Sequence, residues 1–321
     1  AEKDAIKARS PITHVQEEVM NVMPMANILA RGAYDKPGER VEAAVPAALG
    51  KLPEKAPKNR LGLAQWLVSD RNPLLARVAM NRLWQFVFGT GLVRTTEDFG
   101  TAGEWPSHPE LLDWLALDFV ASGWNVKKLH RTIVLSAAYR QASTATPAQL
   151  ERDPDNVLLA RGPHQRLSAE MIRDQALFTS GLLVDTIGGE SVKPFQPPGL
   201  WKSVLGAGEW KMDKGDATWR RGLYVYWKRG VPYPSFTAFD ASKRETCTVT
   251  RTRTTTALQA LVLLNDPVYV EAGRALGARM RREGGTDDDA RLRFGFRLVT
   301  SRHATDTELA VLRSLLTDLR A

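Results

Sequence analysis

Repeated helix-start signals constrain the fold of this chain more than any other feature of its sequence. In each of them, a residue that can cap a helix precedes either a proline, which suits a first helical turn, or a run of apolar residues at helical spacing. Two of them have the spacing of a capping box, in which a Glu follows three residues after the cap. The signals are Asn72-Pro73, Ser107 with Glu110, Asn125, Thr146-Pro147, Ser168, Asp266-Pro267, Thr286, and Thr305 with Glu308. They predict a mainly α fold.

The segment 73–88 is predicted to be a helix inside the protein, since apolar residues cover nearly its whole circumference. Its polar residues Arg77, Asn81 and Gln85 recur at every fourth position and form one narrow stripe, with Arg82 beside it. Buried arginines must meet carboxylates or an anionic ligand. We therefore expect Arg77, Asn81 and Arg82 to line a polar pocket. The alternative is a thin edge of the helix that faces solvent.

The distribution of prolines, glycines and aromatic residues predicts how the chain is organised. Residues 1–58 are punctuated by prolines and are predicted to form an extended N-terminal arm. Residues 59–321 are predicted to form a compact multi-helix domain. Within it, residues 186–250 are predicted to be an irregular, aromatic-rich insertion with small β pieces, including the strand-like segment 223–227. Long irregular stretches tend to be functional or to be covered by a partner.

Composition excludes several classes of protein. The net charge of +8 comes from scattered arginines, whereas nucleic-acid binders usually concentrate their positive charge, so we expect no nucleic-acid partner. No run of about 18 apolar residues occurs, so no membrane span is expected. The single Cys247 excludes an internal disulfide and a zinc site built on a cysteine pair, and no C-x-x-C-H haem attachment is present. We therefore expect no metal and no cofactor in this chain.

The candidate catalytic residues are Asp98 and His108. Asp98 follows Glu97 in a loop that ends at a glycine, where two carboxylates could bind a cation or act as acid and base. His108 precedes a proline at a predicted helix start and could serve as a general base or a ligand. The alternatives are that the carboxylates only solvate the loop and that His108 is a surface or capping residue.

The candidate binding residues cluster after the aromatic-rich stretch. Arg251 and Arg253 alternate with threonines, so an extended strand would place both guanidinium groups on one side, where they could bind carboxylate, sulfate or phosphate. They could equally pair with nearby acidic residues in a buried network. The proposed binding set from this region is Trp227, Asp240, Arg244, Glu245, Arg251 and Arg253. We expect this set, the loop with Asp98 and His108, and the Arg77 stripe to converge on one pocket.

Nine tryptophans are an unusual feature of the composition. Trp84 and Trp114 fall on predicted helices and are expected in the core. Four others, at positions 201, 210, 219 and 227, lie in the irregular region. Aromatic rings flanked by charges occur where sugars stack, but tryptophan is also a common anchor of cores and interfaces.

Many of these segments, taken in order, resemble one known family. The motifs that carry the resemblance are Asn81-Arg82-Leu83-Trp84-Gln85, Phe88-Gly89-Thr90-Gly91-Leu92-Val93, Glu97-Asp98-Phe99-Gly100, Ser107-His108-Pro109-Glu110-Leu111-Leu112-Asp113-Trp114-Leu115, Gln196-Pro197-Pro198-Gly199-Leu200-Trp201, Arg244-Glu245-Thr246-Cys247 and Leu258-Gln259-Ala260-Leu261-Val262-Leu263-Leu264-Asn265-Asp266-Pro267. They resemble the uncharacterised C-terminal domain, domain of unknown function 1553, of large secreted planctomycete and verrucomicrobial proteins that carry a cytochrome-c-like module. Thr255 and Ala257 depart from the pattern, which has asparagine and proline there.

The resemblance implies an extracytoplasmic location and a larger parent protein, but no settled activity. Two functions follow as hypotheses. The chain could belong to a polysaccharide-processing or electron-transfer system and bind acidic or sulfated glycans. Alternatively, it is a non-catalytic scaffold that docks the cytochrome-c-like module of the same parent protein.

Overall fold

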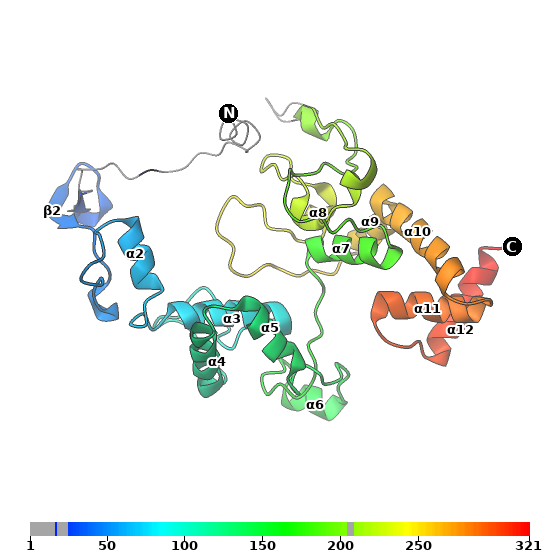
Figure 1. Cartoon of the computed structure of the whole chain (residues 1–321), viewed down its shortest axis with the longest axis horizontal. Helices are drawn as coiled ribbons and strands as arrows, with labels where there is room; N and C mark the ends of the chain where they lie inside the picture. Colours follow the sequence, from blue (N-terminus) through cyan, green and yellow to red (C-terminus); the bar gives the residue numbers. More distant parts are fainter. Residues whose placement is uncertain (1–16, 18–24, 204–208) are drawn as a thin grey trace, which may run out of the picture. The chain divides into compact units, whose positions relative to one another are not determined.

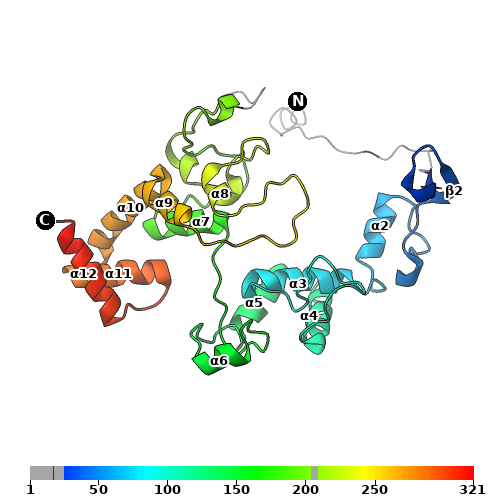
Figure 2. The same cartoon turned by 180° about the vertical axis from the view of Figure 1, so that it is seen from behind.

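The computed structural model describes residue 17 and residues 25–203 and 209–321, and this part of the chain is mainly helical (Figures 1 and 2). It contains eleven α-helices and one sheet of two strands, which confirms the predicted fold class. By its internal contacts the chain divides into two compact units, Ala1–Pro163 and His164–Ala321, which we describe separately as unit 1 and unit 2. The predicted division into an arm to residue 58 and a domain from residue 59 stays a prediction.

The described part of the arm opens unit 1 with a small hairpin. Strands β1 (Met25–Leu29) and β2 (Pro37–Glu42) pair antiparallel, with Met25 opposite Glu42. The hairpin is followed by a short 3-10 helix, η2 (Ala47–Leu49). The only paired strands of the described residues therefore lie in the arm, and not in the irregular region for which β structure was predicted.

Helices α3, α4 and α5 of unit 1 pack side by side around its apolar core (Figure 1). The helices of the unit are α2 (Arg60–Leu67), α3 (Leu75–Phe88), α4 (Pro109–Ala121), α5 (Val126–Leu135) and α6 (Pro147–Arg152). The buried core residues are Met80, Trp84, Leu92, Val93, Leu112, Leu115, Phe119, Leu129 and Ile133. Gly89 ends α3 in a left-handed conformation, with φ of 89°, which a residue with a Cβ atom adopts only at a cost.

Helix α3 is not buried on all sides, so that prediction is wrong. The neighbouring helices α4 and α5 pack against α3, and three of its residues, Met80, Asn81 and Trp84, are buried. Phe86 remains 74% exposed. Trp84 is a core residue as predicted, but Trp114 on α4 is 56% exposed. The predicted capping box of Ser107 and Glu110 is also absent, since His108 is the N-cap and makes no side-chain cap bond.

Unit 2 is built from a helical core and a C-terminal helical hairpin (Figure 2). Its helices are α7 (Ala169–Ser180), α8 (Pro234–Ala238), α9 (Ala257–Asn265), α10 (Pro267–Glu283), α11 (Asp288–Thr300) and α12 (Asp306–Asp318). Ala169, Val225, Tyr233, Phe236, Phe239 and Tyr269 form a buried cluster. Ser168 caps α7 and Thr305 caps α12 with Glu308, as predicted. The predicted cap at Thr286 is wrong by one position, because Asp287 caps α11.

Ion pairs join the last two helices of unit 2. Arg320 forms an ion pair with Asp288 at 2.5 Å, and Arg313 forms another with Asp289. Both pairs are exposed, and both cross from the start of α11 to α12 or to the residues just after it. The hairpin therefore depends in part on contacts between opposite charges in water.

Two buried arginines bind backbone carbonyls in the irregular region, at residues 186–190 and 218–220. Arg220 donates to the carbonyl oxygens of Thr186, Gly188 and Glu190, and its guanidinium lies 3.8 Å from the centre of the Tyr224 ring. Arg173, on α7, donates to the carbonyl oxygens of Thr218 and Arg220. Isolated bridges join Val184 to Arg220 and Val192 to Val225, and no longer strand forms in these described residues. Guanidinium groups thus satisfy carbonyls that a sheet would otherwise pair.

Candidate functional site

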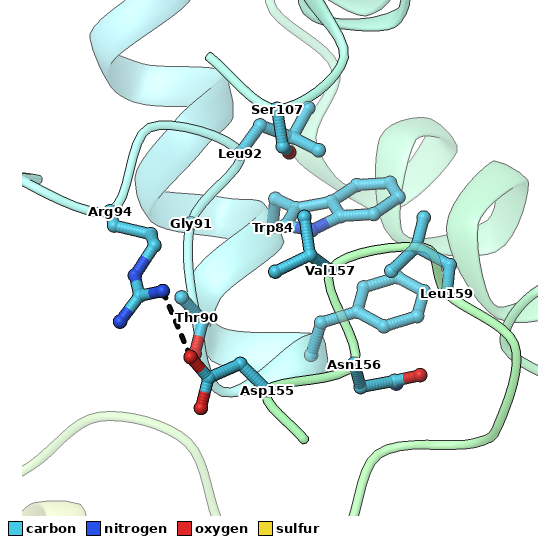
Figure 3. Close-up of a pocket in the computed structure, with 11 residues that line it drawn as sticks. Trp84, Thr90, Gly91, Leu92, Arg94, Ser107, Asp155, Asn156, Val157 and Leu159 are labelled. Atoms are coloured by element: carbon cyan, nitrogen blue, oxygen red, sulfur yellow. Dashed lines mark hydrogen bonds and ion pairs between the residues drawn. The ribbon is translucent and has the colours of Figure 1, made fainter. Parts of the chain in front are cut away.

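Unit 1 contains a small pocket beside the C-terminal end of α3, which we call the Trp84 pocket (Figure 3). Its volume is about 120 Å³. Its lining residues are Trp84, Phe88, Thr90, Gly91, Leu92, Arg94, Ser107, Asp155, Asn156, Val157 and Leu159. Figure 3 shows the apolar side chains of Trp84, Val157 and Leu159 together, with Arg94 and Asp155 at the edge of the group.

The first wall of the pocket is the loop that follows α3, and Asn81 holds it in place. The Asn81 amide donates to the carbonyl of Val93 at 2.9 Å and accepts from the Val93 amide at 2.9 Å. Asn81 is completely buried. Gly91 packs directly against it, since a Cβ at position 91 would lie 2.6 Å from the Asn81 side-chain nitrogen. One buried amide therefore fixes the path of residues 91–93.

The second wall is the loop 153–161, which buried polar contacts also hold. The Asp153 carboxylate accepts hydrogen bonds from the amides of Val157 and Leu158, each at 2.8 Å. Asn156 and Leu159 both have left-handed backbone conformations, with φ of 55° and 53°. Such conformations are uncommon for residues other than glycine and persist only where surrounding contacts enforce them.

Opposite charges meet at the mouth of the pocket. Arg94 Nη1 lies 3.0 Å from Asp155 Oδ2, and Arg94 Nε lies 3.7 Å from Glu104 Oε2. The floor is aromatic, because the Trp84 and Phe88 rings stack with centroids 4.2 Å apart. The pocket thus has an apolar interior and one charged side.

The predicted catalytic residues do not line this pocket, although His108 follows the lining residue Ser107 in the sequence. Asp98 accepts a hydrogen bond from the Gly100 amide at 2.7 Å, and Glu97 is exposed. His108 Nδ1 lies 3.0 Å from the hydroxyl oxygen of Ser107. Both candidates make local contacts, and neither forms a hydrogen bond or ion pair with the other among the described residues. Their catalytic roles stay predictions.

Arg77, Asn81 and Arg82, the α3 residues predicted to line a polar pocket, have different surroundings. Arg77 forms an ion pair with Asp113 of α4 at 2.6 Å, and the hydrogen bond from Arg77 lowers the pKa of Asp113. Asn81 is the buried residue that holds the pocket wall. Arg82 is exposed and has no hydrogen bond or ion pair within the described residues. Only Asn81 of these three residues therefore supports the Trp84 pocket.

The binding residues predicted in unit 2 take their partners mainly from α7 and from the segment before it. Arg251 bonds both carboxylate oxygens of Glu170, at 2.8 and 3.1 Å. Arg253 donates to the side-chain oxygen of Gln165. The Arg244 guanidinium lies 4.7 Å from the Trp227 ring centre, and Glu245 is exposed.

Asp240 is the centre of a second polar network in unit 2. It accepts from Arg166 at 2.5 Å and from the Thr254 amide at 2.8 Å. Burial alone would raise the pKa of Asp240, but the hydrogen bonds from Thr254 and the charge of Arg166 together lower it. Arg166 was not predicted, because it lies 74 residues from its partner and no local pattern marks it. The convergence of these residues with those of unit 1 stays a prediction.

Helix α9 has its polar side chain inside and its leucines outside. Gln259 is 5% exposed and donates to the Ala238 carbonyl at 3.0 Å and to the Thr254 hydroxyl at 3.1 Å. Four leucines of the helix are exposed: Leu258, Leu261, Leu263 and Leu264. Leu258, Leu261 and Leu264 recur at every third position along one side of the helix, and we call these three side chains the α9 face.

Two specialised features are absent from the described residues. No group of three or more His, Cys, Asp or Glu side chains in them could hold a metal ion. Among the same residues, no helix has both the length and the apolar character required to cross a membrane.

Comparisons with known proteins support the family that the motifs suggested. A search of curated proteins and a search of solved structures each found no match. A family model, PSD1, described as a protein of unknown function (DUF1553), matches residues 59–316. Because this match covers most of the chain, the protein belongs to the PSD1 (DUF1553) family.

Proposed function

We propose that this protein is a non-catalytic docking module that binds another protein domain through the α9 face. The observation that carries the proposal is the inverted arrangement of α9, in which Gln259 is buried and Leu264 is 72% exposed. A helix on the surface of a folded unit normally turns its apolar residues inward. Exposed apolar patches of this kind are typical of protein interaction sites.

The inward position of Gln259 explains why the leucines face outward. Its side chain bonds the end of α8 and the segment before α9, and its oxygen accepts from the Thr256 amide at 3.2 Å in the capping box of α9. These bonds fix the rotation of α9 about its own axis. Burying the exposed parts of these three leucines would contribute about 3 to 5 kcal/mol to association.

The partner that we propose is the cytochrome-c-like module of the same parent protein. Its support is the family resemblance, which also supports an extracytoplasmic location and a planctomycete or verrucomicrobial type of parent.

Cysteine labelling tests the proposal, because Cys247 is the only native cysteine. In a Cys247→Ser background, Leu261→Cys on the α9 face and Val311→Cys on α12 should react at similar rates in the full chain alone. Adding the cytochrome-c-like module should protect position 261 and leave position 311 reactive. Protection of position 261 without any partner, or equal reactivity of both positions with it, would contradict the proposal.

A second candidate function is binding of acidic or sulfated glycans at Arg253. Arg253 is exposed, bonds the neutral Gln165 side chain, and has its pKa lowered by burial and by the nearby charge of Arg166. An anionic group would relieve this repulsion between like charges. Arg253→Gln should then weaken binding of a sulfated glycan about fivefold, whereas Arg282→Gln on α10 should not. Equal effects of the two variants would indicate only nonspecific attraction.

A further inference from the structure

We propose that the Trp84 pocket of unit 1 binds a single neutral sugar ring. The site is built from unit 1 alone, whereas the α9 face belongs to unit 2. The inference depends on three properties of the pocket: its walls are fixed in advance, its lining is divided into an apolar and a polar part, and its lining charges cancel.

The walls are fixed by side chains that do not themselves line the pocket. Asn81 holds the loop with Gly91 and Leu92 from one side, and Asp153 holds the loop with Val157 from the other. The second loop is tied further by Gln141, which donates to the Leu159 carbonyl at 2.6 Å. Loops held in this way by buried polar groups keep a binding site in its binding geometry before the ligand arrives.

Backbone strain is concentrated in the same loop. Asn156 and Leu159 line the pocket and both have positive φ values. A left-handed conformation costs about 1 to 3 kcal/mol at a residue with a side chain. Strained conformations of this kind cluster at ligand-binding sites, and here two of them lie within four residues.

The lining is divided between an apolar wall and a polar edge. Trp84, Phe88, Leu92, Val157 and Leu159 supply apolar surface, whereas Thr90, Arg94 and Asp155 supply donors and acceptors (Figure 3). A sugar ring has the same division, with C–H groups on its faces and hydroxyl groups around its edge. The ring would place a C–H face on the apolar wall and neighbouring hydroxyls on Arg94 and Asp155.

The charges favour a neutral ligand over a charged one. Arg94 and Asp155 neutralise each other at 3.0 Å, and a hydroxyl can donate to Asp155 or accept from Arg94 without separating them. An anionic sugar would also meet Glu104, which lies 3.7 Å from Arg94. A zwitterion such as a free amino acid would have to compete with the ion pair at both of its ends.

The size of the pocket limits the ligand to one ring. A volume of about 120 Å³ corresponds to about four water molecules at ~30 Å³ each. A whole pyranose with its hydroxyls is larger than this space, so one part of a single ring would enter the pocket and the rest of the ring would lie at its mouth.

The test is titration of the full chain with methyl α-D-glucopyranoside, methyl α-D-mannopyranoside and methyl β-D-galactopyranoside. Binding is followed by the indole N–H resonance of Trp84, assigned with Trp84→Phe. At least one glycoside should shift this resonance, and glucuronic acid should bind at least about fivefold more weakly than that glycoside. Asp155→Asn should weaken binding about tenfold, since it removes a charged hydrogen-bond acceptor.

Two further variants make the test decisive. Asp118→Asn removes a comparable exposed carboxylate, which pairs with Lys128 at 2.8 Å, and should leave sugar binding unchanged. Val157→Phe should fill the pocket and abolish binding, with folding checked by circular dichroism. The proposal would be overturned if none of the three glycosides shifted the resonance, or if Asp155→Asn and Asp118→Asn had equal effects. It would also be overturned if glucuronic acid, or leucine as a free amino acid, bound more strongly than the glycosides.

Discussion

Helices α3 and α9 both turn an amide side chain inward, but they differ in whether their apolar residues are buried. Each turns one amide side chain inward to hold a neighbouring segment: Asn81 bonds Val93, and Gln259 bonds Ala238 and Thr254. In α3, the neighbours of the amide, Met80 and Trp84, are buried with it. In α9, the amide is the only buried residue.

This difference shows that the apolar content of a helix does not determine whether its apolar side chains are buried. An inward amide supplies hydrogen bonds to buried groups of a nearby segment. It occurs in both helices, whether their apolar residues are buried or exposed. Whether those residues are then covered depends on which elements pack against the helix. The α4 and α5 helices cover part of α3, while the four leucines of α9 remain exposed in unit 2.

The largest expected effect compares the apolar residues of the two helices. Met80→Ala should lower the free energy of unfolding by about 3 to 4 kcal/mol, because it leaves a cavity at a completely buried position. Leu261→Ala should lower it by less than about 1 kcal/mol, because most of its side chain is already in water. Urea denaturation of both variants measures the difference. Similar losses would mean that α9 is covered within the chain, and the comparison would fail.

The next largest effect concerns the inward amide of α3. Asn81→Ala should destabilise the protein by about 2 to 3 kcal/mol, because it leaves the buried N–H of Val93 without a partner and its carbonyl with only the 3.5 Å hydrogen bond from the Thr96 hydroxyl. Asn265→Ala is the matched control, since Asn265 is exposed and bonds only the Leu261 carbonyl. Denaturation of the two variants should differ clearly. If they lose the same stability, Asn81 does not hold the pocket wall.

A smaller effect, dependent on pH, is expected for the network that precedes α9. The pKa of Asp240 is lowered in the folded protein from its ordinary value of 3.8, so the ionised carboxylate stabilises the fold. This contribution is complete above the ordinary pKa and is lost as the pH falls through the lowered pKa.

Asp240→Asn should therefore cost about 1 to 2 kcal/mol at pH 7 and progressively less below about pH 4. Unfolding curves of wild type and variant between pH 7 and pH 2.5 measure this. A difference that stays constant down to pH 2.5 would show that the carboxylate charge contributes nothing.

The smallest effect is expected at Cys247, in the loop that leads to α9. The thiol is free and exposed, so Cys247→Ser should change the free energy of unfolding by less than about 0.5 kcal/mol. Thermal unfolding of the variant checks this, and it also validates the background for labelling the α9 face. A clear loss of stability would show that the loop makes a contact through this residue.

Local signals predicted the helices well, and long-range contacts explain what they missed. Asn125, Ser168 and Thr305 each cap the helix that follows, because a cap depends only on the next three residues. Asp287 replaces Thr286 as a cap because both side chains can accept the same bond. Pro109 begins α4, which makes His108 the N-cap in place of Ser107.

The candidate site was less predictable because its walls come from distant parts of the sequence. The pattern on α3 identified Asn81 as a polar residue of a buried helix, but it could not show that its partner is the backbone of Val93. Asp155 meets Arg94 from 61 residues away. No spacing rule connects two loops across such a distance. The strand predicted at 223–227 is reduced to an isolated bridge between Val192 and Val225.

Two parts of unit 2 should differ in their stability at low pH and in concentrated salt: the segments that Arg173 and Arg220 hold through backbone carbonyls, and the C-terminal hairpin. A carbonyl has no proton to gain in acid, and it has no net charge for salt ions to screen. The carboxylates of Asp288 and Asp289, which pair with arginines in solvent, can be protonated in acid and carry a charge that salt ions screen. At low pH or in concentrated salt, the C-terminal hairpin should therefore open first, while the arginine-held region keeps its shape.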